Sequence, residues 1–114
     1  MEGNVMSDLE NILVQQIQWA KLPAPHREYC HVIPKRKYRF DLAWPEFRFA
    51  VEVQGATWIK AAHSTGGGIE RDCEKIVLAQ LAGWNVFPVT GGQIQSGLAI
   101  RWIQSALRQY EETK

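Results

Sequence analysis

The spacing at which apolar residues recur changes several times along the chain, and each stretch of constant spacing predicts one helix or strand. Apolar residues recur at helical spacing after a run, from Ser7 to Glu10, that has the form of a capping box, and Pro23 and Pro25 then end the helix. Alternation with a period of two predicts strands farther along. In chain order, the predicted elements are a helix over residues 7–20, strands over 29–33, 38–44 and 47–54, a helix over 69–82, a strand over 84–89 and a helix over about 98–110.

This order, α-β-β-β-α-β-α, predicts an α/β sandwich in which a mixed central sheet is flanked by helices. The length of 114 residues suits a single domain that takes in the whole chain. Pro45 and Glu46 form the turn between the second and third strands, and Pro88 indicates that the last strand lies at an edge of the sheet. Gly91 and Gly92 predict a further turn before the last helix.

The helix predicted over residues 69–82 separates apolar from charged side chains, and Gly83 suits its C-terminal cap. Its buried face is predicted to consist of Ile69, Cys73, Ile76, Val77 and Leu81. Its solvent-facing side is predicted to consist of Arg71, Glu74 and Lys75. Three tryptophans, Trp44, Trp84 and Trp102, are expected in the core.

The composition is that of an ordinary globular protein, with 46% apolar and 22% charged residues. Cys30 and Cys73 do not form a CxxC pattern, which disfavours a zinc site or a disulfide framework and favours free buried thiols in a reducing compartment. The start of the chain lacks the pattern of a signal peptide, and no stretch approaches the roughly 18 apolar residues of a membrane span. We therefore expect a cytoplasmic protein that does not bind membranes.

Basic residues gather before the second predicted strand, although the net charge of the chain is only +1. The cluster consists of Arg27, Lys35, Arg36, Lys37 and Arg39. A local patch of this kind can bind phosphate groups even when the total charge is near zero. Charge alone favours the alternative of a solvated loop, so the interpretation depends on what lies beside the cluster.

The main chemical signal is a group of polar residues on the hairpin of the second and third predicted strands. Asp41 alternates with apolar residues on its strand, and Glu52 and Gln54 do the same on the next strand. If the strands pair about the turn, Asp41 and Glu52 lie close together, and neighbouring carboxylates repel unless a cation separates them. Such oxygen ligands suit Mg²⁺ or Mn²⁺. The alternative is an ordinary solvent-facing sheet surface, although helices are expected to cover both faces.

These residues resemble the motif of the PD-(D/E)XK nuclease superfamily, and several later segments are similar to its very-short-patch-repair endonuclease branch. The matching segments are Phe40-Asp41, Val51-Glu52-Val53-Gln54-Gly55, His63, Glu70-Arg71-Asp72 and Leu81-Ala82-Gly83-Trp84-Asn85-Val86. The run from Arg36 to Pro45 also resembles small nucleases of phage and prophage genomes. The similarity extends over roughly residues 7–107 and implies a restriction-endonuclease-like α-β-β-β-α-β core with an extra C-terminal helix.

The resemblance implies a role for each matching residue of the hairpin. Asp41 is the central metal ligand, Glu52 the second, and the backbone carbonyl of Val53 a third. Gln54 stands where relatives carry the Lys that orients the attacking water or stabilises the phosphate. An amide can position water but cannot neutralise negative charge. Glu10 matches an acidic ligand on the first helix of many relatives, and its alternative role is the capping box.

Further roles concern residues outside the hairpin. His63 matches a histidine near the scissile phosphate and can shuttle a proton near neutral pH, or is an ordinary loop residue. Asp72 either orients His63 or interacts with the positive N-terminus of its helix. Trp58 can stack on a base. His26 and His31 match nothing in the family and are interpreted as structural.

Together these features predict a metal-dependent DNA endonuclease that hydrolyses phosphodiester bonds. Phosphate contacts through the basic cluster give affinity without sequence readout. We expect no recognition helix or extra domain for a long specific site in this sequence, so branched, nicked or mismatched DNA is the expected substrate, including four-way junctions in repair, recombination or phage DNA processing. A homodimer would permit paired cuts. The alternatives are a DNA-binding module that lost catalysis, a structural or partner-binding protein whose carboxylates bind no metal, and an RNA nuclease.

Overall fold

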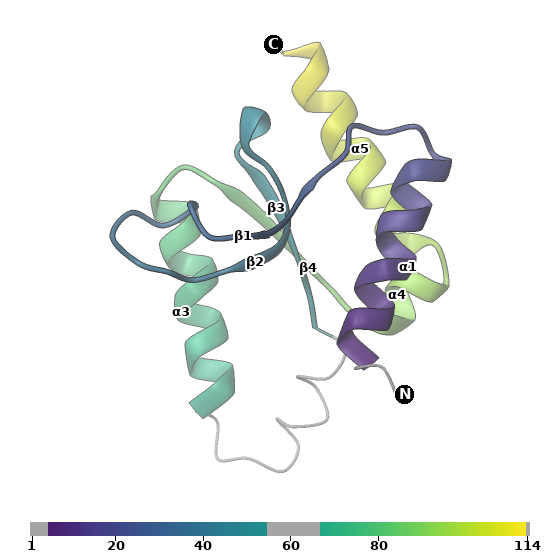
Figure 1. The fold of residues 1–114 in the computed structure, drawn as a ribbon. Helices are drawn as coiled ribbons and strands as arrows, with labels where there is room; N and C mark the ends of the chain where they lie inside the picture. Colours follow the sequence, from purple (N-terminus) through teal and green to yellow (C-terminus); the bar gives the residue numbers. More distant parts are fainter. Residues whose placement is uncertain (1–4, 55–66, 114) are drawn as a thin grey trace.

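In the described part of the chain, four strands form a mixed open sheet in the order β1-β2-β3-β4, and helices lie against both faces of it (Figure 1). The computed structural model describes residues 5–54 and 67–113. The elements are α1 (Val5–Trp19), β1 (His26–Tyr29), β2 (Phe40–Trp44), the 3-10 helix η1 (Pro45–Phe47), β3 (Phe49–Val53), α3 (Gly67–Leu81), β4 (Asn85–Val89), α4 (Gly91–Gln95) and α5 (Leu98–Glu112).

The pairing of the strands explains how the sheet can hold a site. β1, β2 and β3 are successive antiparallel neighbours, whereas β4 pairs with β3 in parallel. A parallel return requires a crossover, and α3 supplies it. β4 lies at the edge of the sheet. An edge strand tolerates Pro88, because a proline has no N–H to donate to a second neighbouring strand. The predicted α/β class, the hairpin and the edge position of the last strand are confirmed.

Two apolar clusters, one on each face of the sheet, hold the layers together. The first lies between the sheet and the helices α1, α4 and α5, and the second between the sheet and α3 (Figure 1). Trp44 and Phe49 are fully buried in the first cluster, with ring centroids 5.2 Å apart. Phe40, Ala79 and Trp84 belong to the second. Both faces of β2 and β3 are therefore covered, as the sequence predicted.

The first strand was predicted in the wrong place. β1 is His26–Tyr29 and ends where the predicted strand over residues 29–33 begins. Val32 and Ile33 are nevertheless buried, because they insert into the second apolar cluster. Their hydrophobic character therefore reflects core packing of an irregular segment and not strand pairing.

The ends of other elements also differ from the prediction. α1 begins at Val5, so Ser7 lies inside the helix and the predicted capping box does not start it. Residues 45–47 form η1, so β3 starts only at Phe49. The predicted turn at Gly91 and Gly92 is instead the start of α4, where the Thr90 hydroxyl accepts from the N–H of Gln93.

The orientation of α3 is the largest departure from the predicted packing. Ile69, Cys73, Val77 and Leu81 are exposed, with Leu81 at 79% exposure. Ala79 is buried against the sheet, and Ile76 and Leu78 pack around it. The helix is thus rotated away from its most apolar stripe, and Lys75, which was predicted on the solvent-facing side, is mostly buried.

Smaller predictions had mixed outcomes. Gly83 ends α3 with a φ of 90°, as its predicted role requires, because an L side chain rarely adopts this conformation. Trp44 and Trp84 are in the core, but Trp102 is 39% exposed. Cys30 is only half-buried, so the prediction of buried thiols was wrong for both cysteines. Among the described residues, no helix is long and apolar enough to cross a membrane.

Candidate metal centre

Asp41 lies where the regular pairing of β2 and β3 ends. The register of the two strands ends with Leu42 opposite Val51. Beyond that pair, carboxylate oxygens of side chains accept the hydrogen bonds of the backbone N–H groups. The Asp41 carboxylate accepts from the N–H of Val53 at 2.7 Å, and Glu52 Oε1 accepts from the N–H of Asp41 at 3.0 Å. The two acidic residues are thereby tied to each other's strands.

The predicted alternation of β2 fails at the same place. A regular strand would put Phe40, Leu42 and Trp44 on one face. Leu42 and Trp44 do share the first apolar cluster, but Phe40 packs with Ala43 in the second cluster, next to α3. This change of face coincides with the side-chain hydrogen bonds of Asp41, so the residue is held at a local irregularity of the strand.

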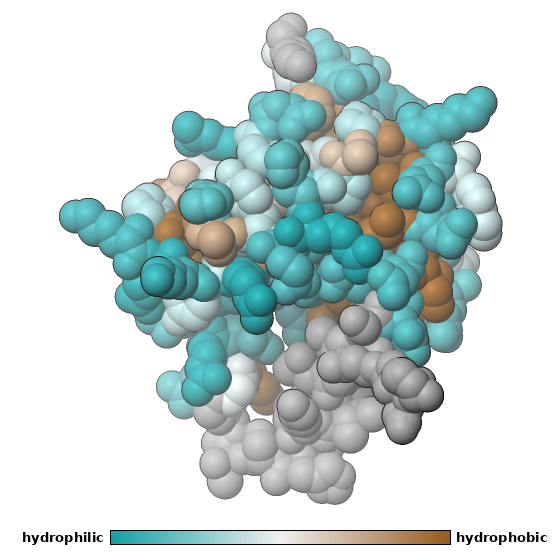
Figure 2. Space-filling view, in the orientation of Figure 1, coloured by the Kyte–Doolittle hydropathy of each residue, from teal (hydrophilic) through white to brown (hydrophobic). Residues whose placement is uncertain are grey.

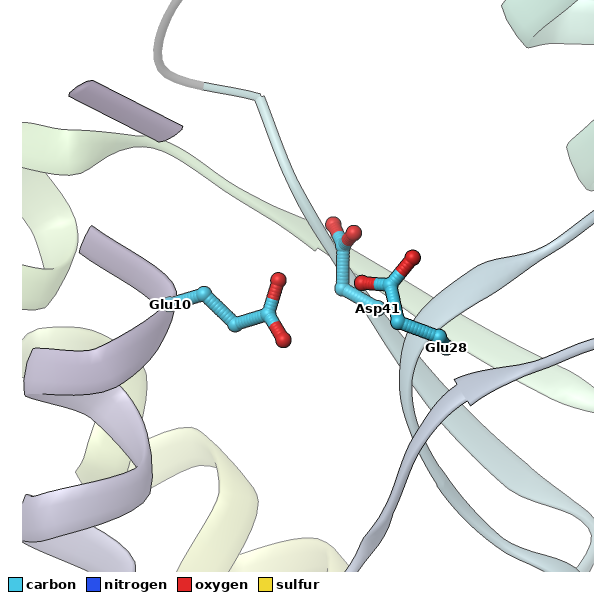
Figure 3. A group of neighbouring side chains, drawn as sticks. All are labelled: Glu10, Glu28 and Asp41. Atoms are coloured by element: carbon cyan, nitrogen blue, oxygen red, sulfur yellow. The ribbon is translucent and has the colours of Figure 1, made fainter. Parts of the chain in front are cut away.

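Three carboxylates from three different elements converge at this irregularity. Glu10 comes from α1, Glu28 from β1 and Asp41 from β2, and one oxygen of each lies within 4.8 Å of the others. Figure 3 shows Glu10 reaching from its helix toward the strands on which Asp41 and Glu28 lie side by side. Glu10 is buried, Asp41 half-buried and Glu28 exposed. We call these residues the carboxylate triad.

Glu28 joins the triad from an unusual backbone conformation. Its φ is 51°, in the left-handed region, although it lies within β1. A non-glycine residue there is strained, by about 1 kcal/mol or more. β1 therefore does not follow a regular alternation of faces, and the position of the Glu28 carboxylate beside Asp41 could not be read from a period of two.

Glu52 lies next to the triad but has different partners. The residue is 8% exposed, and its second oxygen, Oε2, accepts a hydrogen bond from the ammonium of Lys75 on α3. The Lys75 ammonium also lies 4.4 Å from the centre of the Phe40 ring, where a cation–π interaction is favourable. The site therefore has a carboxylate triad on one side of Asp41 and a carboxylate–ammonium pair on the other.

Burial controls the protonation of these carboxyl groups. Loss of water around the charged form raises the pKa of Glu52 to about 7, and the negative charge of Asp41 adds to this effect, while Lys75 opposes it. Burial also raises the pKa of Asp41, which the hydrogen bond from Val53 opposes. The pKa of Glu10 is raised as well, chiefly by burial and against the effect of Arg27. The carboxylates are thus poorly solvated near neutral pH.

Basic side chains partly balance the acidic groups. Arg27 Nε donates to Glu10 Oε2 at 2.9 Å, and an Arg39 nitrogen lies 3.6 Å from a Glu28 oxygen. Among the described residues, Arg27, Arg39 and Lys75 pair with carboxylates of the group Glu10, Glu28, Asp41 and Glu52, which leaves one negative charge in this set when all are ionised. Clustered carboxylate oxygens with excess negative charge and little water fit a hard divalent ion such as Mg²⁺ or Mn²⁺.

Other predicted site residues lie around this centre. Gln54 directly follows β3, is half-buried, and donates its backbone N–H to the carbonyl of Val89 at 2.7 Å. Lys35 and Lys37 are exposed. Arg36 is also exposed, and it pairs with Glu74 at 3.2 Å. The surface drawn in Figure 2 is mainly hydrophilic over β1 and β2. The basic cluster is therefore both solvated and adjacent to the acidic groups, through Arg27 and Arg39.

The remaining predicted residues lie outside the described part of the chain or on the surface around the centre. His63 and Trp58 lie outside the described residues. Asp72 is half-buried on α3, and the contact with His63 that was predicted for it also falls outside the described part of the chain. His26 and His31 are exposed and pack edge-on against the ring of Tyr29, at centroid distances of 5.7 and 5.4 Å.

Two residues of the centre, Glu28 and Lys75, were missed by the sequence analysis. Glu28 was missed because the first strand was placed after it, and the run His26 to Tyr29 has too few apolar residues to indicate a strand. Lys75 was missed because the apolar stripe of α3 was assumed to face the sheet. The available signal was the spacing of four residues between Lys75 and Ala79, because residues four apart lie on the same face of a helix. Ala79 is buried, so Lys75 faces the same layer.

The comparisons with known proteins leave the geometry as the basis for a functional conclusion. Searches of family models, curated proteins and solved structures found no match for this chain. Two surface pockets, of about 420 and 460 Å³, are lined by none of the four carboxylates. The larger lies against α5 near Lys21, and the smaller lies between β4 and α5. The carboxylate triad with Glu52 and Lys75 therefore remains the strongest candidate for a functional site.

Proposed function

We propose that this chain is a divalent-metal-dependent DNA endonuclease with a restriction-endonuclease-like core. The observation that carries the proposal is the convergence of Glu10, Glu28 and Asp41 around one point, beside the buried Glu52. Three of these four residues were named from the sequence, through their resemblance to PD-(D/E)XK nucleases. The α/β arrangement, with a helix on one side of the acidic hairpin and a crossover helix on the other, is compatible with this core.

The proposed roles follow from where each side chain lies. Asp41, Glu10 and Glu28 would hold Mg²⁺ or Mn²⁺. Glu52, whose Oε1 accepts from the N–H of Asp41, would be a further ligand. Such an ion, when bound, polarises a phosphate oxygen and lowers the pKa of a water molecule. Gln54, one residue beyond Val53, can position that water through its amide.

The surface around the centre supports a nucleic-acid substrate. Lys35, Lys37 and the neighbouring arginines of the basic cluster lie in the segment between β1 and β2, both of which contribute to the carboxylate triad. Basic side chains there would contact the phosphates that flank the scissile bond. Contacts of this kind carry no sequence information, so the proposed substrate is defined by shape, such as branched, nicked or mismatched DNA.

A DNA-binding module without catalysis is the second candidate, and the observation that favours it is Gln54. This residue has no charge to stabilise the negative charge that develops on the phosphate. In this candidate, the basic cluster would still bind DNA, and the acidic centre would bind a metal without cleavage.

Cleavage assays separate the two candidates. Purified protein would be incubated with linear, nicked, flapped and four-way DNA, and with RNA of the same sequences, in Mg²⁺, Mn²⁺ or EDTA. The proposed function predicts metal-dependent cuts that are most frequent on branched or nicked DNA. Binding of DNA without cleavage in any metal would support the binding module, and cleavage of RNA alone would contradict a DNA substrate.

Glu28→Gln tests whether the third carboxylate of the triad contributes. The variant keeps the size of the side chain and removes its charge, so the affinity for Mn²⁺ should fall by about tenfold. Isothermal calorimetry with Mn²⁺ measures the change. Glu46→Gln, an exposed glutamate in η1 at the opposite end of the hairpin, is the matched control. Equal affinities in the two variants would exclude Glu28 from the metal centre.

A further inference from the structure

The Lys75 ammonium occupies the position beside Glu52 Oε2 that a metal ion bound to this oxygen would need. Its ammonium binds Glu52 Oε2, while the other oxygen of this carboxylate accepts from the N–H of Asp41. Both Glu52 oxygens are therefore engaged, and the side chains of Lys75 and Glu52 are 14% and 11% exposed. Water cannot easily replace Lys75 there, so Glu52 needs some cation in its place.

We propose that Lys75 is a displaceable counter-ion, which a divalent metal must separate from Glu52 before that carboxylate can become a ligand. This inference rests on the proposed function, since it concerns the same metal centre. The ammonium and the metal compete because both need the oxygen at Oε2 and both neutralise the same excess of negative charge. The metal-free site is thereby kept closed by an ion pair within the chain.

The surroundings of Lys75 explain how it can leave. Its ammonium has a second favourable contact, with the face of the Phe40 ring at 4.4 Å, which Glu52 does not share. The Lys75 side chain is itself 14% exposed, so solvent reaches part of it. A lysine has four flexible methylene groups, and it can move its charge without a movement of the helix.

Competition has a consequence that a supporting role would not have. If Lys75 only holds Glu52 in place for the metal, its removal weakens metal binding. If Lys75 competes, its removal strengthens metal binding, by at least about tenfold for an ion that no longer has to break the pair. Displacement also makes the Lys75 amine accessible when metal is added, whereas a supporting lysine stays protected.

The first test uses the wild-type protein and needs no variant. Acylation of lysines by an amine-reactive reagent would be followed by mass spectrometry, without and with saturating Mg²⁺. The Lys75 amine should react slowly in EDTA and severalfold faster in Mg²⁺, whereas the exposed Lys21 should react equally in both. A Lys75 rate that is unchanged or lower in Mg²⁺ would overturn the proposal.

The second test compares Mn²⁺ binding by the wild type, Lys75→Met and the control Lys21→Met in calorimetry. Tighter binding by Lys75→Met alone supports competition. Equal or weaker binding by Lys75→Met overturns it and leaves the proposed function intact. If Lys75→Met binds Mn²⁺ and the wild type does not, the result supports competition and contradicts the proposed function. If neither the variants nor the wild type bind Mn²⁺, both proposals are overturned.

Discussion

Asp41→Asn is expected to abolish metal-dependent cleavage, with a loss of at least about a thousandfold in the rate. Asp41 is the residue that the two parts of the centre share, since it belongs to the carboxylate triad and also interacts with Glu52. Its replacement removes one charge from every arrangement of ligands that the centre can offer. The Mn²⁺ affinity in calorimetry should fall together with the cleavage rate.

The fold should tolerate this substitution. The amide oxygen of Asn can still accept the hydrogen bond from the N–H of Val53, so the link between β2 and β3 is retained. Asp8→Asn, an exposed aspartate on α1, provides the control for the loss of a negative charge elsewhere. Binding of branched DNA in EDTA should be unchanged in both variants. Full cleavage activity in a folded Asp41→Asn protein would contradict the proposed centre.

The periodic parts of the chain were predictable because burial on one or both faces of an element leaves a repeating pattern. β2, β3, β4 and α5 were located to within a few residues, since each has two or more buried apolar positions close together in the sequence. The proximity of Asp41 and Glu52 followed from the hairpin. The break in alternation at Asp41 did not, because it depends on side-chain hydrogen bonds to backbone groups of the partner strand.

The acidic residue from β1 was unpredictable for a different reason. The sequence of β1 has no apolar alternation, and its strand conformation depends on pairing with β2, where Arg27 lies opposite Leu42. Glu28 also adopts a left-handed conformation that favours glycine, asparagine or aspartate, so its identity gives no indication of it. Only tertiary pairing brings this carboxylate to Asp41.

The burial of Lys75 shows why helix periodicity alone cannot identify the buried face. The i, i+4 stripe of Ile69, Val77 and Leu81 has the stronger apolar pattern, but the small side chain of Ala79 packs against the sheet. Glu52 adds to this, because a mostly buried carboxylate on the sheet requires a cation, and the nearest helix supplies it. The site and the orientation of α3 are therefore coupled, and a prediction that treats them separately misses both.

The second large effect expected is a loss of stability as the pH rises through neutrality. The pKa of Glu52 is about 7 in the folded protein and has its ordinary value of 4.5 in the unfolded chain. Below the unfolded value, both states hold the proton and the contribution of Glu52 to stability is fully present. Between the two values, only the folded state keeps the proton, so unfolding becomes easier with each unit of pH.

Above pH 7 this loss is complete and amounts to about 3 kcal/mol for Glu52. Asp41 and Glu10 change stability in the same direction, since burial raises the pKa of each of them. The free energy of unfolding, measured in urea between pH 4.5 and 8.5, should therefore fall in the wild type. The side chain in Glu52→Gln cannot lose a proton, so the free energy of unfolding of this variant should fall less over the same range. The difference between the falls in wild type and variant should be about 3 kcal/mol.

A divalent metal should reverse the loss only where the carboxylates are ionised. Protons and the metal compete for the same oxygens, so metal binding should stabilise the protein at pH 8 and hardly at pH 5. With a dissociation constant of about 0.1 mM at pH 8, 10 mM Mg²⁺ is in roughly hundredfold excess and would raise the free energy of unfolding by about 3 kcal/mol. Urea unfolding with and without Mg²⁺ at the two pH values measures this difference. Equal stabilisation at both pH values would show that the metal acts somewhere other than at these buried carboxylates.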